Sequence, residues 1–323
     1  MSDEVPLEET NDQVEARSAL VSVIIPCYKQ AHFLPEAIES VLAQTHPEVE
    51  IIVIDDGSPD ATAEVASRYQ RIRYLRQENK GRAEARNAGF RACRGEYVIF
   101  LDADDRLTPP AVKAHLRCFA AHPEAGFIVG DIDHIRGDGS YLYSPRWPIL
   151  TTNHYEELLR VNHVANTMAV MFRRSLLEAL DGFRIRYEPA EDYEILLRAA
   201  RLLPSAHHRT IVAQYRRHTT NTSRRGALML RATHRVMSSQ LPQIRGNREL
   251  ESAWREGSIY WQEHFGAVTI KEIYGSILRF RLLAAARSAA VLVWHLRGRL
   301  ALLPWKNRHK LLNAIRKPHL PPN

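Results

Sequence analysis

One short segment constrains the fold of this chain more than any other. The apolar run Tyr97–Leu101 is followed at once by Asp102 and Asp104. Such a run is typical of a buried strand whose end opens at the ligand-binding edge of an α/β sheet. Residues i and i+2 of an extended segment point the same way, so the two carboxylates are expected to act together. A divalent cation that is bound with phosphates needs only one or two carboxylates from the protein. The competing interpretation is a pair of ordinary loop or helix-cap acids.

The same alternation of apolar runs and helical patterns fills the first third of the chain. Strands are predicted at residues 19–26, 50–54, 72–76 and 97–101, and helices at residues 34–44, 60–69 and 81–93. This order predicts an α/β fold, a mainly parallel sheet with helices on both faces. The second strand ends on Asp55 and Asp56. Because parallel strands bring their carboxyl ends to one edge, these acids are expected near the pair that follows residue 101.

The rest of the chain changes character at residue 226. A helix at 109–121, a strand at 126–135, an aromatic loop at 137–148, a helix at 190–203 and a strand at 210–216 are predicted, and only helices follow Gly226. Residues 1–18 are polar, acidic and aperiodic. We therefore expect a disordered tail at 1–18, an α/β catalytic domain at 19–225 and a helical C-terminal extension at 226–323.

Charge is distributed unevenly between these parts. The net charge is +7, but residues 226–323 hold 16 Lys/Arg and 5 Asp/Glu (+11), whereas residues 1–225 hold 28 and 32 (−4). The chain has three cysteines without a C-x-x-C pair, an acidic N-terminus without an apolar core, and no run of about 18 apolar residues. These features predict a cytoplasmic protein without a signal peptide, a disulfide framework or an ordinary transmembrane helix.

Seven segments, taken in order, resemble family 2 glycosyltransferases of the GT-A fold. They are VSVIIPCYKQ from Val21, VIDDGSPD from Val53, NKGRAEARNAG from Asn79, GEYVIFLDADD from Gly95, DGF from Asp181, AEDYEILLRAA from Ala190 and YRRHTTNTS from Tyr215. The resemblance covers roughly residues 20–225. It implies an inverting, metal-dependent enzyme that moves a sugar from a nucleoside-diphosphate sugar to a hydroxyl of a saccharide or lipid-linked acceptor.

The resemblance assigns the nucleotide to the ends of the first two strands. Pro26 and Tyr28 are expected to form its wall, the alternative being a strand stop and a core aromatic residue. Asp55 and Asp56 are expected to accept hydrogen bonds from the base or ribose, unless one of them only starts the Asp-Gly-Ser turn.

Positive charge for the diphosphate is expected from the segment that follows the third strand. Lys80 and Arg86 fall on the loop and helix that face the donor in the family, and their charges suit a diphosphate. Arg82, on the same helix, is an equally good candidate, and which of these cations is solvated stays open.

The resemblance assigns the remaining donor-side roles to the two carboxylates after the fourth strand. The resemblance implies that Asp102 holds the ribose and that Asp104 binds Mn²⁺ or Mg²⁺, which stabilises the leaving diphosphate. His218 matches a position that completes the metal shell in some relatives, although a lone histidine is also often structural.

The resemblance assigns the acceptor chemistry to a second acidic pair. Asp192 matches the family's catalytic base, which removes the proton of the attacking hydroxyl, and Glu191 lies beside it on the acceptor side. A place at a helix N-terminus is expected to keep Asp192 ionised, and the alternative is that both acids only serve the helix dipole. Trp147 is a candidate for stacking on an acceptor sugar, or for packing.

The basic extension allows two interpretations. Residues 280–305 mix leucines, valines and tryptophans with spaced arginines, which suits an amphipathic helix at the inner face of an anionic membrane. The alternative is a helical subdomain packed on the catalytic domain. Nucleic-acid binding is not expected, because no recognised motif accompanies the charge.

Two other functions compete with sugar transfer. A catalytically silent nucleotide-binding subunit of a membrane polysaccharide assembly is disfavoured by the joint presence of Asp104 and Asp192. A sugar nucleotidyltransferase would carry a glycine-rich loop after its first strand, and residues 26–30 contain no glycine.

Overall fold

The computed structural model describes residues 19–146, 153–164 and 166–296, so Trp147, the 1–18 segment and residues 297–323 lie outside the described part. The chain divides into two compact units. The first contains the residues up to Leu158 together with Asn162–His218. The second contains Leu159–Val161 and the residues from Thr219 onward.

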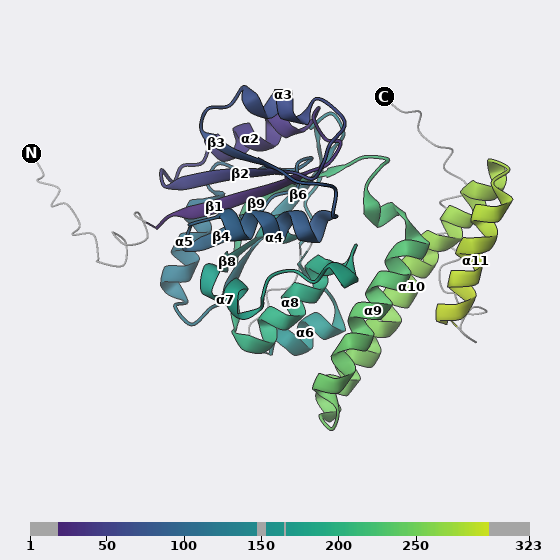
Figure 1. Ribbon diagram of the computed structural model, residues 1–323. Helices are drawn as coiled ribbons and strands as arrows, with labels where there is room; N and C mark the ends of the chain where they lie inside the picture. Colours follow the sequence, from purple (N-terminus) through teal and green to yellow (C-terminus); the bar gives the residue numbers. More distant parts are fainter. Residues whose placement is uncertain (1–18, 147–152, 165, 297–323) are drawn as a thin grey trace, which may run out of the picture. The chain divides into compact units, whose positions relative to one another are not determined.

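The first unit is built on a nine-stranded mixed sheet (Figure 1). Along the sheet the order is β3-β2-β1-β4-β8-β6-β9-β5, with β7 paired to β6. The strands are β1 (Val21–Cys27), β2 (Val49–Asp55), β3 (Ile72–Arg76), β4 (Tyr97–Phe100), β5 (Arg106–Leu107), β6 (Phe127–Arg136), β7 (Tyr141–Tyr143), β8 (Val170–Arg173) and β9 (Ser205–Arg217). The helices of this unit are α2 (Leu34–Leu42), α3 (Thr62–Ser67), α4 (Arg82–Ala92), α5 (Ala111–Ala121), α6 (His154–Arg160), α7 (Arg174–Ala179) and α8 (Glu191–Leu202).

The predicted parallel half of the sheet is confirmed. Strands β3, β2, β1 and β4 pair in parallel, and Ile24 of β1 lies opposite both Ile52 and Phe100. In the other half the strands β6 and β9 were predicted, but β5, β7 and β8 were not: β8 enters antiparallel between β4 and β6, and the two-residue β5 pairs antiparallel with β9. Short strands of this kind carry too few residues for a periodic signal.

Helices cover both faces of the parallel half, as expected. Val21, Val23 and Ile25 belong to a core that also contains α2 and α5. Since side chains alternate along a strand, Ile24 points to the opposite face, where α4 packs. At Gly89 of α4 the helix comes so close to the sheet that a Cβ atom would lie 2.3 Å from Ile24 Cγ2.

Replacing Gly89 with alanine is therefore expected to destabilise the protein by about 1–3 kcal/mol, because the methyl group overpacks a core that cannot yield. In an open helix the same change is expected to stabilise by up to about 1 kcal/mol. Gly275→Ala is the matched control, since it lies in a helix and a Cβ there meets nothing within 4 Å. Urea unfolding of both variants measures the effect, and equal stabilisation by both would contradict the close contact.

A buried pair of histidines joins α5 to β9. His115 Nδ1 and His208 Nε2 lie 3.1 Å apart, and His115 is fully buried. Burial lowers the pKa of His115 well below its ordinary value of 6.5, and burial also lowers the pKa of His208. Below pH 6.5 the unfolded chain therefore binds protons that the folded chain does not bind, and stability falls with falling pH.

We expect His115→Leu to reduce the loss of stability on acidification. The slope of the free energy of unfolding against pH should decrease by up to about 1.4 kcal/mol per pH unit for each titrating group removed. Urea unfolding at pH 7.5, 6 and 5 measures it. The control is His122→Leu, whose side chain is 48% exposed. A His115→Leu profile parallel to that of the wild type would rule out the pair as its source.

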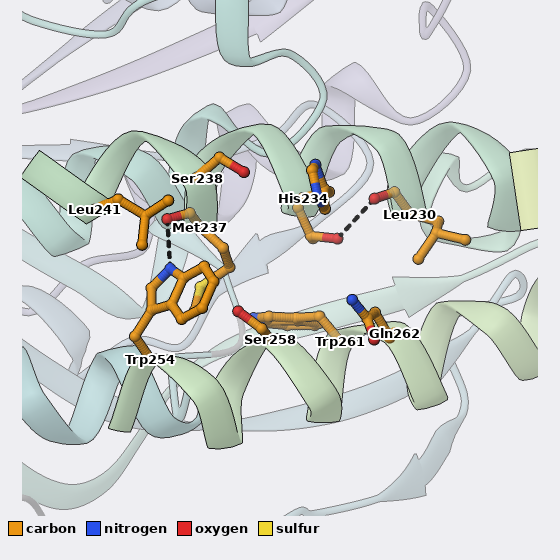
Figure 2. Close-up of a pocket in the computed structure, with 10 residues that line it drawn as sticks. Leu230, His234, Met237, Ser238, Leu241, Trp254, Ser258, Trp261 and Gln262 are labelled. Carbon is orange, nitrogen blue, oxygen red and sulfur yellow. Dashed lines mark hydrogen bonds between the residues drawn. The ribbon is translucent and has the colours of Figure 1, made fainter. Parts of the chain in front are cut away.

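The second unit is helical, as the sequence predicted for its region. It contains α9 (Gly226–Ile244), α10 (Arg248–Leu278) and α11 (Leu282–Leu296). Between α9 and α10 a pocket is lined by Met237, Trp254 and Trp261 among others, and Trp254 Nε1 donates to the Met237 carbonyl at 2.7 Å (Figure 2). None of the helices in the described part of the chain is long and apolar enough to cross a membrane.

Candidate active site

Three carboxylates meet just after β4. Asp102, Asp104 and Asp105 each offer an oxygen within 4.8 Å of the others. The apolar β4 ends at Phe100, and the chain then turns so that the Asp105 N–H donates to the Asp102 carbonyl at 3.0 Å. The sequence predicted that the first two would lie together, whereas the participation of Asp105 depends on this turn.

Asp105 is the most constrained of the three. It is 1% exposed, and its Oδ1 accepts from the Arg216 N–H at 2.7 Å. Among the described residues no donor reaches Asp105 Oδ2. Burial, and then the charges of Asp104 and Asp102, raise the pKa of Asp105 well above its ordinary value. A buried carboxylate oxygen without a donor, beside two further acids, is a donor set that suits a hard divalent cation.

Asp104 is partly accessible, with 15% of its side chain exposed. Its Oδ2 lies 2.8 Å from His218 Nε2 and 3.4 Å from Gln30 Nε2. Two ligand atoms of one octahedral ion are about 3 Å apart when the bonds are 2.0–2.1 Å long. The 2.8 Å contact of Asp104 and His218 is a hydrogen bond whose length is also compatible with two ligands of a single ion, and metal binding by the two residues stays a prediction.

Arg86 connects the carboxylate cluster to the second acidic pair. Its guanidinium donates to Asp102 Oδ1 at 2.7 Å and to Glu191 Oε1 at 2.6 Å. The side chain is 1% exposed, so its charge is used by two protein carboxylates. Contact of Arg86 with a bound diphosphate stays a prediction, since here its guanidinium pairs with Asp102 and Glu191. Burial opposes ionisation of Asp102, but Arg86 and Arg82 outweigh it and hold the pKa of Asp102 below its usual value.

Two other cationic side chains remain partly accessible. Arg82 is 36% exposed, with its Nε 3.6 Å from Glu191 Oε1, so it lies beside the same carboxylate as Arg86. The Lys80 side chain is exposed, while its backbone N–H donates to Asp56. These two residues are better placed than Arg86 to meet an anionic ligand.

Asp192 lies in the first turn of α8, after Glu191, and is half-buried. Its Oδ1 accepts from the Tyr193 N–H at 2.7 Å. Burial, and then the neighbouring charge of Glu191, raise its pKa to about 6. The helix N-terminus therefore does not keep Asp192 as strongly ionised as expected, because desolvation and a like charge outweigh the helix dipole.

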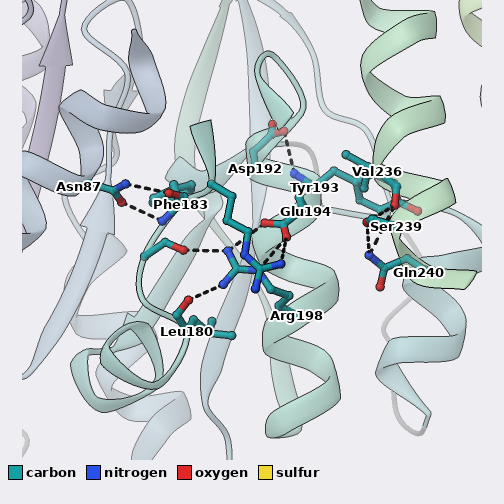
Figure 3. A network of polar contacts seen from close by, with 12 residues as sticks. Asn87, Leu180, Phe183, Asp192, Tyr193, Glu194, Arg198, Val236, Ser239 and Gln240 are labelled. Atoms are coloured by element: carbon teal, nitrogen blue, oxygen red, sulfur yellow. Dashed lines mark hydrogen bonds and ion pairs between the residues drawn. The ribbon is translucent and has the colours of Figure 1, made fainter. Parts of the chain in front are cut away.

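A polar network fixes the start of α8 (Figure 3). Buried Arg198 donates to the Leu180 and Gly182 carbonyls at 2.5 and 2.7 Å and pairs with Glu194. Asn87 of α4 exchanges two 2.8 Å hydrogen bonds with the backbone of Phe183. The 180–183 turn is thus held between α4 and α8, which places Glu191 beside Arg86.

The predicted nucleotide residues divide into buried and accessible ones. Asp55 is fully buried, starts the turn by accepting from the Ser58 N–H, and accepts from the Tyr74 hydroxyl. Asp56 accepts from Gln77 and from the backbone N–H groups of residues 80 and 81. Pro26 is half-buried at the end of β1, and Tyr28 is 42% exposed. Contact of these four with a nucleotide stays a prediction.

Three supporting residues were missed by sequence reasoning. Asn166 Nδ2 lies 3.4 Å from Asp102 Oδ2, Gln30 reaches Asp104, and Arg216 Nε donates to the Asp104 carbonyl at 2.8 Å. Gln30 and Arg216 lie inside segments that carry the family resemblance. No comparable signal marks Asn166, which reaches the site only through the fold.

Comparison with known proteins agrees with this geometry. The family model "Glycosyl transferase family 2" matches residues 22–181. A chondroitin synthase of Escherichia coli is 30% identical over 212 residues, which are 64% of this chain and 30% of the relative. An uncharacterized glycosyltransferase of Nostoc sp., alr2836, is 35% identical over 168 residues, 49% of this chain and 52% of that protein. The chain thus spans about a third to a half of the length of these two curated relatives.

Solved structures show the same fold at low sequence identity. TarS of S. aureus in complex with UDP-GlcNAc has a TM-score of 0.54 and 16% identity, and the match covers 84% of this chain and 89% of that one. The mannosyltransferase PcManGT of Pyrobaculum calidifontis, in complex with GDP-Man and Mn²⁺, has a TM-score of 0.59 and 18% identity over 92% and 81% of the two chains. Through the domain matched at residues 22–181, this chain belongs to glycosyl transferase family 2 and has the GT-A fold.

Proposed function

We propose that residues 19–225 transfer a sugar from a nucleoside-diphosphate sugar to a hydroxyl group, with inversion and with a divalent cation. One observation carries the proposal. The carboxylate cluster of Asp102, Asp104 and Asp105 is joined through buried Arg86 to the acidic pair that begins α8. A cation site for the donor and a carboxylate for the acceptor are thus held together by a single guanidinium.

The donor side is expected to hold the diphosphate through Asp104, His218 and a divalent cation, with Asp102 at the ribose. Mn²⁺ or Mg²⁺ bound there would stabilise the negative charge of the leaving nucleoside diphosphate. Arg82 and Lys80 add positive charge near the same group. The two similar structures were solved with UDP-GlcNAc and with GDP-Man and Mn²⁺, which supports a nucleotide sugar as the donor.

On the acceptor side Asp192 is expected to act as the base. Its carboxylate takes the proton of the acceptor hydroxyl while that oxygen attacks the anomeric carbon and the bond to the diphosphate oxygen breaks. A single in-line displacement inverts the anomeric configuration. Relatives named as chondroitin, hyaluronan and O-antigen biosynthesis proteins support a saccharide or lipid-linked acceptor.

Thermal unfolding with UDP, GDP, CDP and dTDP, each with and without Mn²⁺, tests the donor site. Binding to the folded state alone stabilises it by about 2.7 kcal/mol at a hundredfold excess over Kd, so one nucleotide is expected to raise Tm with metal only. Asp104→Ala should abolish the shift. Glu64→Ala, an exposed acid of α3, should retain it.

Two results would contradict the proposal in different ways. The absence of a shift with any nucleotide would remove the donor site. A metal-dependent shift without sugar transfer to any saccharide acceptor would favour the silent nucleotide-binding subunit.

A further inference from the structure

The turn between α10 and α11 exposes five apolar side chains that are interrupted by two arginines. Phe280 is 90% exposed, Leu283 78% and Leu282 65%. Ile277 and Leu278, which end α10, are also exposed. We call residues 277–283 the basic apolar tip, because Arg279 and Arg281 flank Phe280 and are exposed as well. An apolar cluster of this size on a surface marks an interaction site more often than a chance exposure.

The backbone of the tip makes the exposure of Phe280 unusual. The Phe280 N–H donates to the Ile277 carbonyl at 2.9 Å and the Arg281 N–H to the Ser276 carbonyl at 2.8 Å, which is a Schellman motif. Phe280 occupies the left-handed position of this motif, with φ +55°, where glycine is the favoured residue. A bulky residue there strains the backbone, and one that is 90% exposed gains little packing in return. Strain that the fold does not need indicates a function.

The outward face of α11 continues the apolar surface. Among the described side chains of α11, Ala285, Ser288 and Leu292 are buried, at the spacing of one helical face. Outside that face Val293 is 56% exposed and Trp294 69%. Arg287 is the one Lys or Arg among residues 282–296. The helix therefore presents apolar side chains and a tryptophan on its outward face. Such a face is typical of a helix that lies in a membrane interface.

The charge of this region indicates which partner covers the surface. Residues 276–323 contain ten Lys/Arg and no Asp or Glu. A second copy that docks through the same surface would bring the same positive charge to the contact, and residues 297–323, with seven Lys/Arg and no acid, offer no complement either. An anionic lipid surface complements the arginines and accepts the apolar side chains at once.

We propose that the basic apolar tip and the outward face of α11 bind the surface of an anionic lipid bilayer. Phe280, Leu282 and Leu283 insert at the level of the headgroups, while Arg279 and Arg281 bind lipid phosphates. This function does not depend on sugar transfer.

Sedimentation of the full chain with phosphatidylcholine vesicles, with and without phosphatidylglycerol, tests the proposal. We expect binding only to the anionic vesicles, and weaker binding at higher salt. Phe280→Gly is the decisive variant, because it removes the inserted ring and relieves the backbone strain. It should lower vesicle affinity at least about tenfold while Tm stays equal or rises. The double variant Arg279→Glu/Arg281→Glu should lower affinity by at least about tenfold, since each basic residue near the surface is worth roughly fivefold.

The control is Leu202→Ser, which removes an exposed apolar side chain (52%) from the first unit and should leave vesicle binding unchanged. Three results would overturn the proposal. They are equal binding to neutral and anionic vesicles, wild-type binding by both tip variants, and a concentration-dependent dimer that Phe280→Gly dissociates, which would assign the surface to a second copy.

Discussion

Asp192→Asn is expected to lower kcat for sugar transfer by about 10²–10⁴-fold, the range by which a positioned general base accelerates a reaction. Asparagine has the same shape and can still accept the hydrogen bond from the Tyr193 N–H, so only the proton acceptor is lost. The pKa of Asp192 is raised above that of an unfolded aspartate, so its ionised form costs the folded state stability at neutral pH. The variant should therefore retain or exceed the wild-type Tm.

The pH dependence distinguishes a base from a merely structural acid. The carboxylate is the active form, so wild-type kcat should rise with pH through about 6, the value to which burial raises the pKa of Asp192, and then level off. Initial rates with the matching nucleotide sugar from pH 5 to 8 measure this. Nucleotide affinity should be unchanged in the variant, and Glu178→Gln, an exposed acid of α7, should behave as the wild type. Asp192→Asn with wild-type kcat would exclude Asp192 as the base.

Arg86→Met is expected to destabilise the fold by about 3–5 kcal/mol, because removing one partner of a buried ion pair leaves the opposite charge unpaired. Here two carboxylates, Asp102 and Glu191, lose the Arg86 guanidinium at once, and Arg82 remains only at 3.6 Å from Glu191. Urea unfolding at pH 7 measures the loss. In the wild type the charges of Arg86 and Arg82 overcome burial and depress the pKa of Asp102. The stability from this pairing is present above the ordinary pKa of 3.8 and is lost as pH falls through the lower folded value, so the two proteins should converge in acid.

The same helix supplies the control for this change. Arg91 of α4 is 61% exposed and pairs with Glu84 at the surface, so Arg91→Met should change stability by less than about 1 kcal/mol. Equal effects of the two substitutions would show that Arg86 is not a structural link. Because Arg86 positions Asp102 and Glu191, a folded Arg86→Lys protein should show weaker metal-dependent nucleotide binding than the wild type.

The parallel half of the fold could be read from the sequence because its signals are local. Each of β1, β2 and β4 is a run of Val, Ile and other apolar residues, and the helix at α2 shows its buried face in the spacing of Leu34, Ile38 and Val41. Strands β5, β7 and β8 have two to four residues each and therefore lack a period to read. Their places in the sheet follow from pairing with distant segments.

The sequence by itself determined the acidic residues at the ends of the strands and the order of the segments that identify the family. Local patterning suffices for this, because a buried strand and the polar residue after it are neighbours in the chain. Tertiary structure alone decided what each charge does. Arg86, Asp102 and Glu191 come from positions up to 105 residues apart, and their roles depend on which partner each finds in a buried environment. The pKa of Asp192 likewise depends on burial and on the charges around it, which spacing along the chain does not encode.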